Sequence, residues 1–190
     1  MKLQLALATA MVAMSIAATY GKECAGVQFP DEVDVQRTPV KLNGLGVRKA
    51  TVFKVNIYVV ALYLAEPSSD PRAILASDAP SELILQFMRA VRANELRKSW
   101  EEGFANNSPG HPPALEKGLK QLDGWVTDVK SGERVSFIRI PGSGMQVDVN
   151  GTVKGAIAGD EFARALLSIW LGENPQTPEL KSGLLGGACG

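Results

Sequence analysis

The stretch from Leu42 to Leu64, LNGLGVRKATVFKVNIYVVALYL, places one arginine between a glycine-rich segment and a long apolar strand. Apolar and polar side chains alternate from Phe53 to Val59, as in a β-strand with one buried face. From Val59 to Leu64 both faces are apolar, so this half of the strand is predicted to be covered on two sides. Arg48 thus lies at the start of a strand that can line an apolar pocket.

Extended segments flank this stretch, and two Asn-Gly pairs mark turns between them. The run Asn43-Gly44-Leu45-Gly46 predicts a hairpin near residue 44, because Asn and Gly tolerate positive φ. Asn150-Gly151 predicts a second hairpin, between strands at 145–149 and 152–157. Further strands are expected over 81–91 and 134–141.

Helical segments are expected where apolar residues recur every three or four positions. They cover 71–76, 94–104 and the stretches that follow Pro113 and Asp160. Asp160 is predicted to be the N-cap of a helix that ends at Gly172, and a short helical piece follows Thr177. The order of strands, helices, strands and helix predicts an α+β domain with an antiparallel sheet and helices gathered on one face.

The composition limits the size and the partners of the protein. The chain has 190 residues, of which 45% are hydrophobic, and this is enough for one domain with a substantial core. Its 20 Lys and Arg residues balance 20 Asp and Glu residues, so no net positive field attracts a polyanion. We therefore expect a single domain that does not bind nucleic acid.

The amino-terminal segment has the pattern of a secretory signal peptide, with Lys2 followed by an apolar run from Leu3 to Ala18 and then by small residues. We predict a signal peptide over residues 1–21, whose cleavage leaves a mature domain at 22–190 without a stable membrane anchor. A retained anchor is the alternative, although the run is short for a bilayer span of about 20 residues. The short basic region favours export to a bacterial periplasm.

Cys24 and Cys189 are the two cysteines of the chain, one at each end of the predicted mature domain. In an oxidising compartment they can form a disulfide that closes the whole domain, and the alternative is that both remain free thiols. Two distant cysteines and the lone His111 give little support to a metal site. No metal is therefore predicted.

The remaining polar residues favour binding over catalysis. His111 lies in a proline-rich loop, and no nucleophile motif accompanies it. Arg89 falls in register with the apolar residues of the strand at 81–91, where an unpaired charge is costly to bury. The alternative is that Arg89 lies at the strand end and reaches solvent or a carboxylate. The candidate ligand-binding residues are Arg48, Tyr58, Arg89 and Lys98.

Two parts of the sequence resemble one family. Gly44-Leu-Gly46-Val-Arg48, with the strand that ends at Leu64, resembles the early strands of the chalcone isomerase superfamily. Leu171-Gly-Glu173 and Thr177-Pro-Glu-Leu-Lys181 resemble its carboxyl-terminal helix and the tail after it. The similarity keeps its order and spacing from about residue 27 to about residue 185. The chain resembles in particular the bacterial, secreted chalcone isomerase-like proteins.

The resemblance implies an open-faced β-sandwich, in which a large antiparallel sheet carries a layer of helices and a ligand cleft lies between the two. It also implies that Arg48 is the cleft arginine, which orients a flavonoid in the plant enzymes and holds a carboxylate in the fatty-acid-binding relatives. The enzyme's strand threonine corresponds to Tyr58, and its helix lysine corresponds to Lys98. Its other helix residues, a tyrosine, an asparagine and a threonine, correspond to about Glu95, Glu102 and Ile169, which have lost the enzyme's chemistry.

We therefore predict a non-catalytic periplasmic binding protein for an amphipathic anionic ligand, a fatty acid or a haem-like porphyrin, with Arg48 as the anchor. No cofactor is required. If the ligand is haem, its axial ligand would be Tyr58, Tyr63, His111 or a methionine. An isomerase of the family's type that acts on another substrate is the first alternative. The second is a structural or partner-binding domain whose cleft is filled by Trp100, Trp125 and Trp170.

Overall fold

The computed structural model describes residues 21–50, 55–108, 110 and 113–190 of the chain. Within these residues the strands are β1 (Glu23–Cys24), β2 (Val27–Gln28), β3 (Glu32–Val35), β4 (Thr38–Lys49), β5 (Asn56–Leu64), β6 (Ser81–Phe87), β7 (Arg134–Ile140), β8 (Gly144–Val149) and β9 (Thr152–Ile157). The helices are α1 (Pro71–Ala76), α2 (Ala93–Asn107), α3 (Pro113–Trp125), α4 (Asp160–Leu171) and α5 (Pro178–Leu184). The predicted signal peptide, apart from Gly21, and His111 lie outside the described residues.

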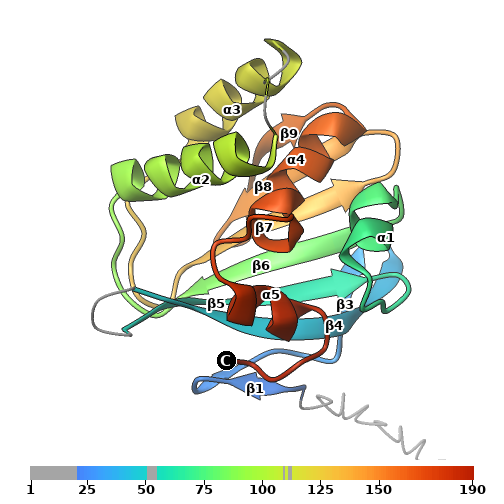
Figure 1. The fold of residues 1–190 in the computed structure, drawn as a ribbon, viewed down its shortest axis with the longest axis vertical. Coiled ribbons are helices and arrows are strands. Elements are labelled where there is room, and N and C mark those ends of the chain that lie inside the picture. Colours follow the sequence, from blue (N-terminus) through green and yellow to red (C-terminus); the bar gives the residue numbers. More distant parts are fainter. Residues whose placement is uncertain (1–20, 51–54, 109, 111–112) are drawn as a thin grey trace, which may run out of the picture.

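One large antiparallel sheet organises the domain. Its seven strands follow the order β3-β4-β5-β6-β7-β8-β9, so each strand pairs with its neighbours in sequence, and β1 and β2 form a separate two-stranded sheet. Figure 1 shows the helices on one face of the curled large sheet and β1 beyond its opposite face. The predicted α+β class, with a helical layer on one face of an antiparallel sheet, is confirmed.

β5 is buried on both faces, as its apolar run predicts. Alternate side chains belong to the core between sheet and helices (Tyr58, Val60, Leu62 and Leu64) and to a second core on the opposite face (Val59, Ala61 and Tyr63). Phe29, which follows the β1–β2 pair, contributes to the second core and covers the sheet there. The Tyr63 hydroxyl donates to the Pro30 carbonyl oxygen at 3.0 Å, which fixes the amino-terminal segment to this face.

The predicted hairpin near residue 44 is wrong, because β4 runs through this position without a turn. The turn between β3 and β4 lies earlier, at Gln36 and Arg37, whose φ angles of 50° and 69° fit a two-residue hairpin turn. Gln and Arg are not typical residues for positive φ, so this turn has no recognisable sequence signal. The second predicted hairpin is confirmed, because Asn150 and Gly151 connect β8 and β9 with φ angles of 54° and 80°.

The glycines of β4 allow α5 to dock closely. A Cβ atom on Gly44 would lie 2.5 Å from the Leu184 carbonyl oxygen, and one on Gly46 would lie 2.7 Å from the Leu180 carbonyl oxygen. Asn43 fastens the same contact, because its Nδ2 donates to the Leu184 carbonyl oxygen at 2.7 Å. β4 and α5 therefore meet backbone to backbone, which requires residues without a side chain at these positions.

The carboxyl-terminal tail covers an edge of β4. β3 pairs with β4 only from Thr38 to Lys41, so the edge beyond Lys41 has no partner among the described strands. α5 and the tail after it pass this edge, and Cys189 reaches the second core, where it forms a disulfide with Cys24. The two Cα atoms are 5.8 Å apart. Covering the edge in this way prevents it from pairing with another chain.

The helices lie close to their expected positions, and they place Trp100, Phe104 and Leu122 in the core between the layers. The predicted N-cap of α4 is wrong by one residue, because Gly159 is the N-cap and Asp160 is the first helical residue. In the first turn of α4, the Asp160 carboxylate still interacts favourably with the positive end of the helix dipole. Among the described residues, no helix is long and apolar enough to cross a bilayer.

Gly44→Ala should lower the free energy of unfolding by about 1–3 kcal/mol, because the added methyl group would force α5 away from β4. Urea denaturation measures this change. Gly124→Ala is the matched control, since Gly124 lies in α3 and a Cβ atom there would meet no other atom within 4 Å. This control should be neutral or slightly stabilising. Equal stability of the two variants would contradict the close docking of α5.

Replacing both Cys24 and Cys189 by Ala should lower the free energy of unfolding by about 3–5 kcal/mol, because the bridge spans 165 residues and restricts the unfolded chain. Urea denaturation with and without a reductant measures the effect. The reductant should destabilise the wild-type protein and leave the double variant unchanged. A wild-type protein that is equally stable in both conditions would show that the bridge does not stabilise the domain.

Candidate functional site

Arg48 and Tyr58 lie side by side on the helix-facing side of the sheet. They are direct partners in the β4–β5 register, so their side chains extend from the same face. Arg48 is half-buried, and its Nη1 donates to the Lys49 carbonyl oxygen at 2.5 Å. The ion pair found among the described residues lies elsewhere, so no carboxylate of this part of the chain neutralises the Arg48 guanidinium at close range.

The Tyr58 hydroxyl joins three elements through side-chain hydrogen bonds. Tyr58 is 4% exposed, and its hydroxyl donates to Oε1 of Gln176 in the link between α4 and α5. Gln176 Nε2 in turn donates to Oγ of Ser99 on α2 at 3.0 Å. The Tyr58 ring also packs edge-to-face on Phe87, with the ring centroids 5.4 Å apart. This chain of contacts connects β5, the α4–α5 link and α2 at one end of the sheet.

Burial raises the pKa of Tyr58, so its hydroxyl is neutral and acts as a hydrogen-bond donor at neutral pH. The neighbouring Trp170 indole, the Arg48 guanidinium and Gln176 oppose this rise in pKa. Trp170 Nε1 lies near the hydroxyl but makes no well-formed hydrogen bond within the described structure. Three hydrogen-bond donors therefore lie together at one end of the sheet, on Arg48, Tyr58 and Trp170, and we call this place the Arg48 corner. Gln176 Oε1 is the side-chain acceptor bonded there.

Large aromatic side chains fill the space between the sheet and the helices. Trp100 and Trp170 are 1% and 0% exposed, and both lie against Phe137 of β7 with ring centroids 5.4 and 5.8 Å away. The Trp100 Nε1, like that of Trp170, is buried without an acceptor in the described residues. The interior next to Arg48 and Tyr58 is thus closed in this structure, and two indole N–H groups remain unsatisfied inside it.

The structure brings Arg48 and Tyr58 together but directs the other two predicted site residues to solvent. Arg89 is exposed and lies beyond the end of β6, as the alternative interpretation of that strand predicts. Lys98 is exposed on α2, where its Nζ lies 3.9 Å from a carboxylate oxygen of Glu102. A role for Arg89 and Lys98 in ligand binding stays a prediction.

The three helix positions that correspond to enzyme residues are also placed by the structure. Glu95 and Glu102 are exposed on α2. Ile169 is 0% exposed, and its side chain occupies the space next to Gly103, where a Cβ atom would lie 2.7 Å from Ile169 Cγ2. An apolar side chain packed against a helix backbone cannot donate or accept a hydrogen bond, so this position contributes packing only.

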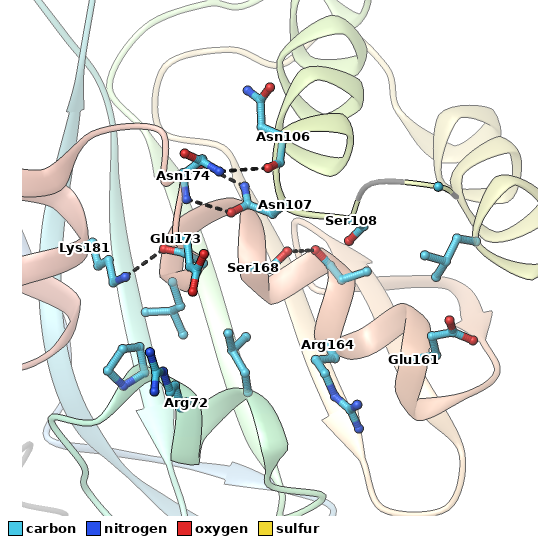
Figure 2. A pocket seen from close by; sticks show the side chains of 17 residues that line it. Arg72, Asn106, Asn107, Ser108, Glu161, Arg164, Ser168, Glu173, Asn174 and Lys181 are labelled. Carbon is cyan, nitrogen blue, oxygen red and sulfur yellow. Dashed lines mark hydrogen bonds between the residues drawn. The ribbon is translucent and has the colours of Figure 1, made fainter. Parts of the chain in front are cut away.

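A separate open groove lies on the helical layer, bounded by α1, the end of α2, α4 and α5, with a volume of about 780 Å³. Figure 2 shows basic and acidic side chains around it, including Arg72, Arg164 and Glu161. Lys181 at its rim donates from Nζ to the Gly172 carbonyl oxygen at 2.7 Å. Both signs of charge face this groove, so its lining selects for neither anions nor cations.

Asparagines close one end of the groove (Figure 2). Asn107 Nδ2 donates to the carbonyl oxygens of Gly103 and Asn174 at 3.0 and 2.8 Å, and its Oδ1 accepts from the Asn174 backbone N–H at 2.9 Å. Asn174 Nδ2 donates to the Asn106 carbonyl oxygen at 3.0 Å. These bonds tie the end of α2 to the α4–α5 link, the segment that also carries Gln176.

The sequence gives little indication of Ser99, Gln176 and the asparagine cluster. Ser99 lies within an amphipathic helix, where a serine is unremarkable, and Gln176 follows Pro175 in a link without periodicity. The Asn106-Asn107 pair indicates only the end of a helix. In the part of the chain that the structure describes, no group of three or more His, Cys, Asp or Glu side chains is placed to hold a metal ion.

Comparison with known proteins identifies the family. The chalcone isomerase-like family matches residues 21–186, so this chain belongs to the chalcone isomerase-like family. Among solved structures, the chain is similar to a fatty-acid binding protein of Arabidopsis thaliana, with a TM-score of 0.66 and 15% sequence identity. The match covers 84% of this chain and 92% of that protein. A comparison with curated protein sequences finds no match.

Asn107→Ala should lower the free energy of unfolding by about 1–3 kcal/mol, because it removes two hydrogen bonds that hold the α4–α5 link at Asn174 and one to Gly103 within α2. Asn106→Ala is the matched control, since only the backbone of Asn106 takes part in the cluster. It should leave stability nearly unchanged. Thermal or urea denaturation of both variants measures the difference, and equal losses would show that the cluster does not anchor the link.

Proposed function

We propose that this protein is a non-catalytic binding protein for an amphipathic carboxylate, with a fatty acid as the leading ligand and Arg48 as its anchor. The observation that carries the proposal is the excess of donors at the corner formed by Arg48, Tyr58 and Trp170. A carboxylate has only acceptor oxygens and pairs bidentately with a guanidinium, so it suits this corner. It would take the place of Gln176 Oε1 on the Tyr58 hydroxyl.

The apolar part of the ligand would lie between the sheet and the helices, where the fold of this family places its cleft. Trp100 and Trp170 now occupy that space, so binding requires their side chains to move aside. Their unsatisfied indole N–H groups favour such a movement, because each buried donor without a partner costs about 1–3 kcal/mol. The similarity in fold to a fatty-acid binding protein of Arabidopsis thaliana supports the same class of ligand.

The positions of three residues argue against catalysis of the isomerase type. Ring closure of a phenolate requires a network that orients the nucleophile and stabilises the enolate. Glu95 and Glu102 are exposed, and Ile169 is packed in the core, so none of them can supply that network at the Arg48 corner. The residues around Arg48 and Tyr58 are suited instead to bind and orient a charged group.

We also propose that the protein is exported and carries its ligand outside the cytoplasm. The amino-terminal pattern of a signal peptide and the pairing of Cys24 with Cys189 fit an oxidising compartment such as a periplasm. A haem-like porphyrin is the alternative ligand. Of the tyrosines named as its axial ligands, Tyr58 faces the helices, whereas Tyr63 belongs to the opposite core.

Arg48→Ala should weaken the binding of dodecanoate by about 2 kcal/mol, a factor of about 30 in Kd, and leave folding largely intact. Tryptophan fluorescence measures binding, because Trp100 and Trp170 border the proposed path of the acyl chain. Arg37→Ala is the control, since Arg37 is an exposed arginine in the turn at the other end of β4. Dodecanol, which lacks the carboxylate, should bind both variants and the wild type with similar affinity.

The alternatives give different results in the same experiments. Equal affinity of wild type and Arg48→Ala for dodecanoate would contradict the anchor role. Haemin that binds far more tightly than dodecanoate and produces a shifted Soret band would favour the porphyrin. Cyclisation of a chalcone that Arg48→Ala abolishes would support an isomerase. If none of these ligands binds, and native mass spectrometry finds no co-purified lipid or pigment, the structural alternative is favoured.

A further inference from the structure

A second arginine, Arg139, lies on the helix-facing side of the sheet at the end opposite to Arg48. Arg48 pairs with Tyr58, and Tyr58 pairs with Phe87 at the end of β6. Arg139 on β7 pairs with Ser81 at the beginning of β6. Only 2% of Arg139 is exposed, which is rare for an arginine without an ionic partner.

The Arg139 guanidinium is only partly satisfied by the protein. Its Nη1 donates to the carbonyl oxygen of Ser77, the C-cap residue of α1. Its Nε is buried without a partner in the described structure. The one ion pair found in the described part of the chain joins Lys98 and Glu102, so no described carboxylate oxygen lies within 4.0 Å of Arg139. A buried charge in this state is costly unless another group compensates it.

The charged groups that face Arg139 do not provide this compensation at close range. Asp160 at the start of α4 and Asp78 after α1 attract the guanidinium, whereas Arg164 of α4 repels it. All three side chains are exposed, so solvent screens their effect. Burial has the largest effect and lowers the pKa of Arg139, although an arginine remains charged at neutral pH.

Arg139 lines a cavity of about 370 Å³ between the end of β5, α1 and the start of β6. α1 lies over this end of the sheet (Figure 1). Seven of the twelve lining residues are apolar, among them Leu64, Ile74 and Ala79, and three serines, Ser68, Ser77 and Ser81, also line it. Glu66 is the acidic residue of the lining, and its side chain is exposed and forms no ion pair with Arg139. A cavity with a mainly apolar lining, a few hydroxyl groups and one buried cation has the character of a site for an amphipathic anion.

We propose that this cavity is a second binding site, separate from the Arg48 corner, that binds a medium-chain carboxylate through the Arg139 guanidinium. The ligand carboxylate would accept hydrogen bonds from Arg139, and its hydrocarbon chain would contact Leu64, Ile74 and Ala79. At about 30 Å³ for each water-sized group, the cavity holds on the order of twelve non-hydrogen atoms, which fits octanoate. This site does not depend on the function proposed for Arg48.

The test uses the purified, disulfide-bonded protein and follows octanoate binding by calorimetry and by NMR of the Leu64 and Ile74 methyl groups. Octanoate should shift these methyl signals. Octanol lacks the carboxylate, and acetate and phosphate lack the chain, so each should bind at least tenfold more weakly. Acetate or phosphate that binds as tightly as octanoate would overturn the assignment to an amphipathic ligand, and so would an absence of octanoate binding at these methyl groups.

Two variants test the contributions of the arginine and of the cavity space to octanoate binding separately. Arg139→Met should weaken octanoate binding at least tenfold without loss of stability, because methionine fills a similar volume without a buried charge. Ala79→Phe keeps Arg139 but fills the cavity, so it should weaken binding equally. If Arg139→Met does not fold, the Ala79→Phe variant tests the second site by itself. Arg134→Met is the matched control on the same strand, where Arg134 is exposed and its Nε donates to Gln86 Oε1, and it should leave binding unchanged.

The outcome is independent of the Arg48 proposal. Arg48→Ala should leave the octanoate-induced shifts at Leu64 and Ile74 unchanged, even if it abolishes dodecanoate binding. Octanoate affinity that is unchanged in Ala79→Phe and in folded Arg139→Met would overturn the second site. If Arg48→Ala abolished these shifts and the Arg139 and Ala79 variants did not, octanoate would bind at the Arg48 corner. This result would also overturn the second site.

Discussion

The backbone contact between β4 and α5 holds the layers of this domain together. Gly44 and Gly46 allow the helix to approach the strand closely, and Asn43 fixes the approach with a hydrogen bond to the Leu184 carbonyl oxygen. The position of α5 directs the carboxyl-terminal tail past the free edge of β4 and toward the Cys24 disulfide. It also fixes one end of the α4–α5 link, which carries Gln176 to the Tyr58 hydroxyl. The geometry of the Arg48 corner therefore depends on two residues that have no side chain.

The helix-facing side of the sheet carries an arginine at each end, and the two arginines differ in their burial and in the space beside them. Arg48 is half-buried beside a phenol and an indole, next to a tightly packed aromatic interior. Arg139 is fully buried beside an open cavity whose lining is mainly apolar. A guanidinium retains its charge in both settings, so each position attracts an anion. The space next to Arg48 is created only when side chains move, whereas the space next to Arg139 already exists.

Local patterns predict most of the elements of this fold. The alternation and the apolar run of β5 predict a strand and its two-sided burial, because both are written in the order of apolar and polar residues along the segment. Asn150-Gly151 predicts its hairpin, since that pair adopts positive φ easily. Asn43-Gly44 carries the same signal but lies within a strand, because docking of α5 requires glycine there for another reason. A glycine therefore shows that a side chain is excluded, without showing which neighbour excludes it.

The sequence by itself determines the family and the order of the elements, because these follow from short motifs and from local periodicity, and it singles out Arg48 as a candidate anchor. Only the tertiary structure decides which polar groups meet. Gln176, the partner of Tyr58, lies 118 positions away in the chain, and Ser99, the partner of Gln176, lies 77 positions from it. The burial of Arg139 likewise depends on the packing of α1, whose C-cap residue Ser77 accepts from its guanidinium. Contacts over such separations arise from how layers pack, and no local pattern of residues encodes them.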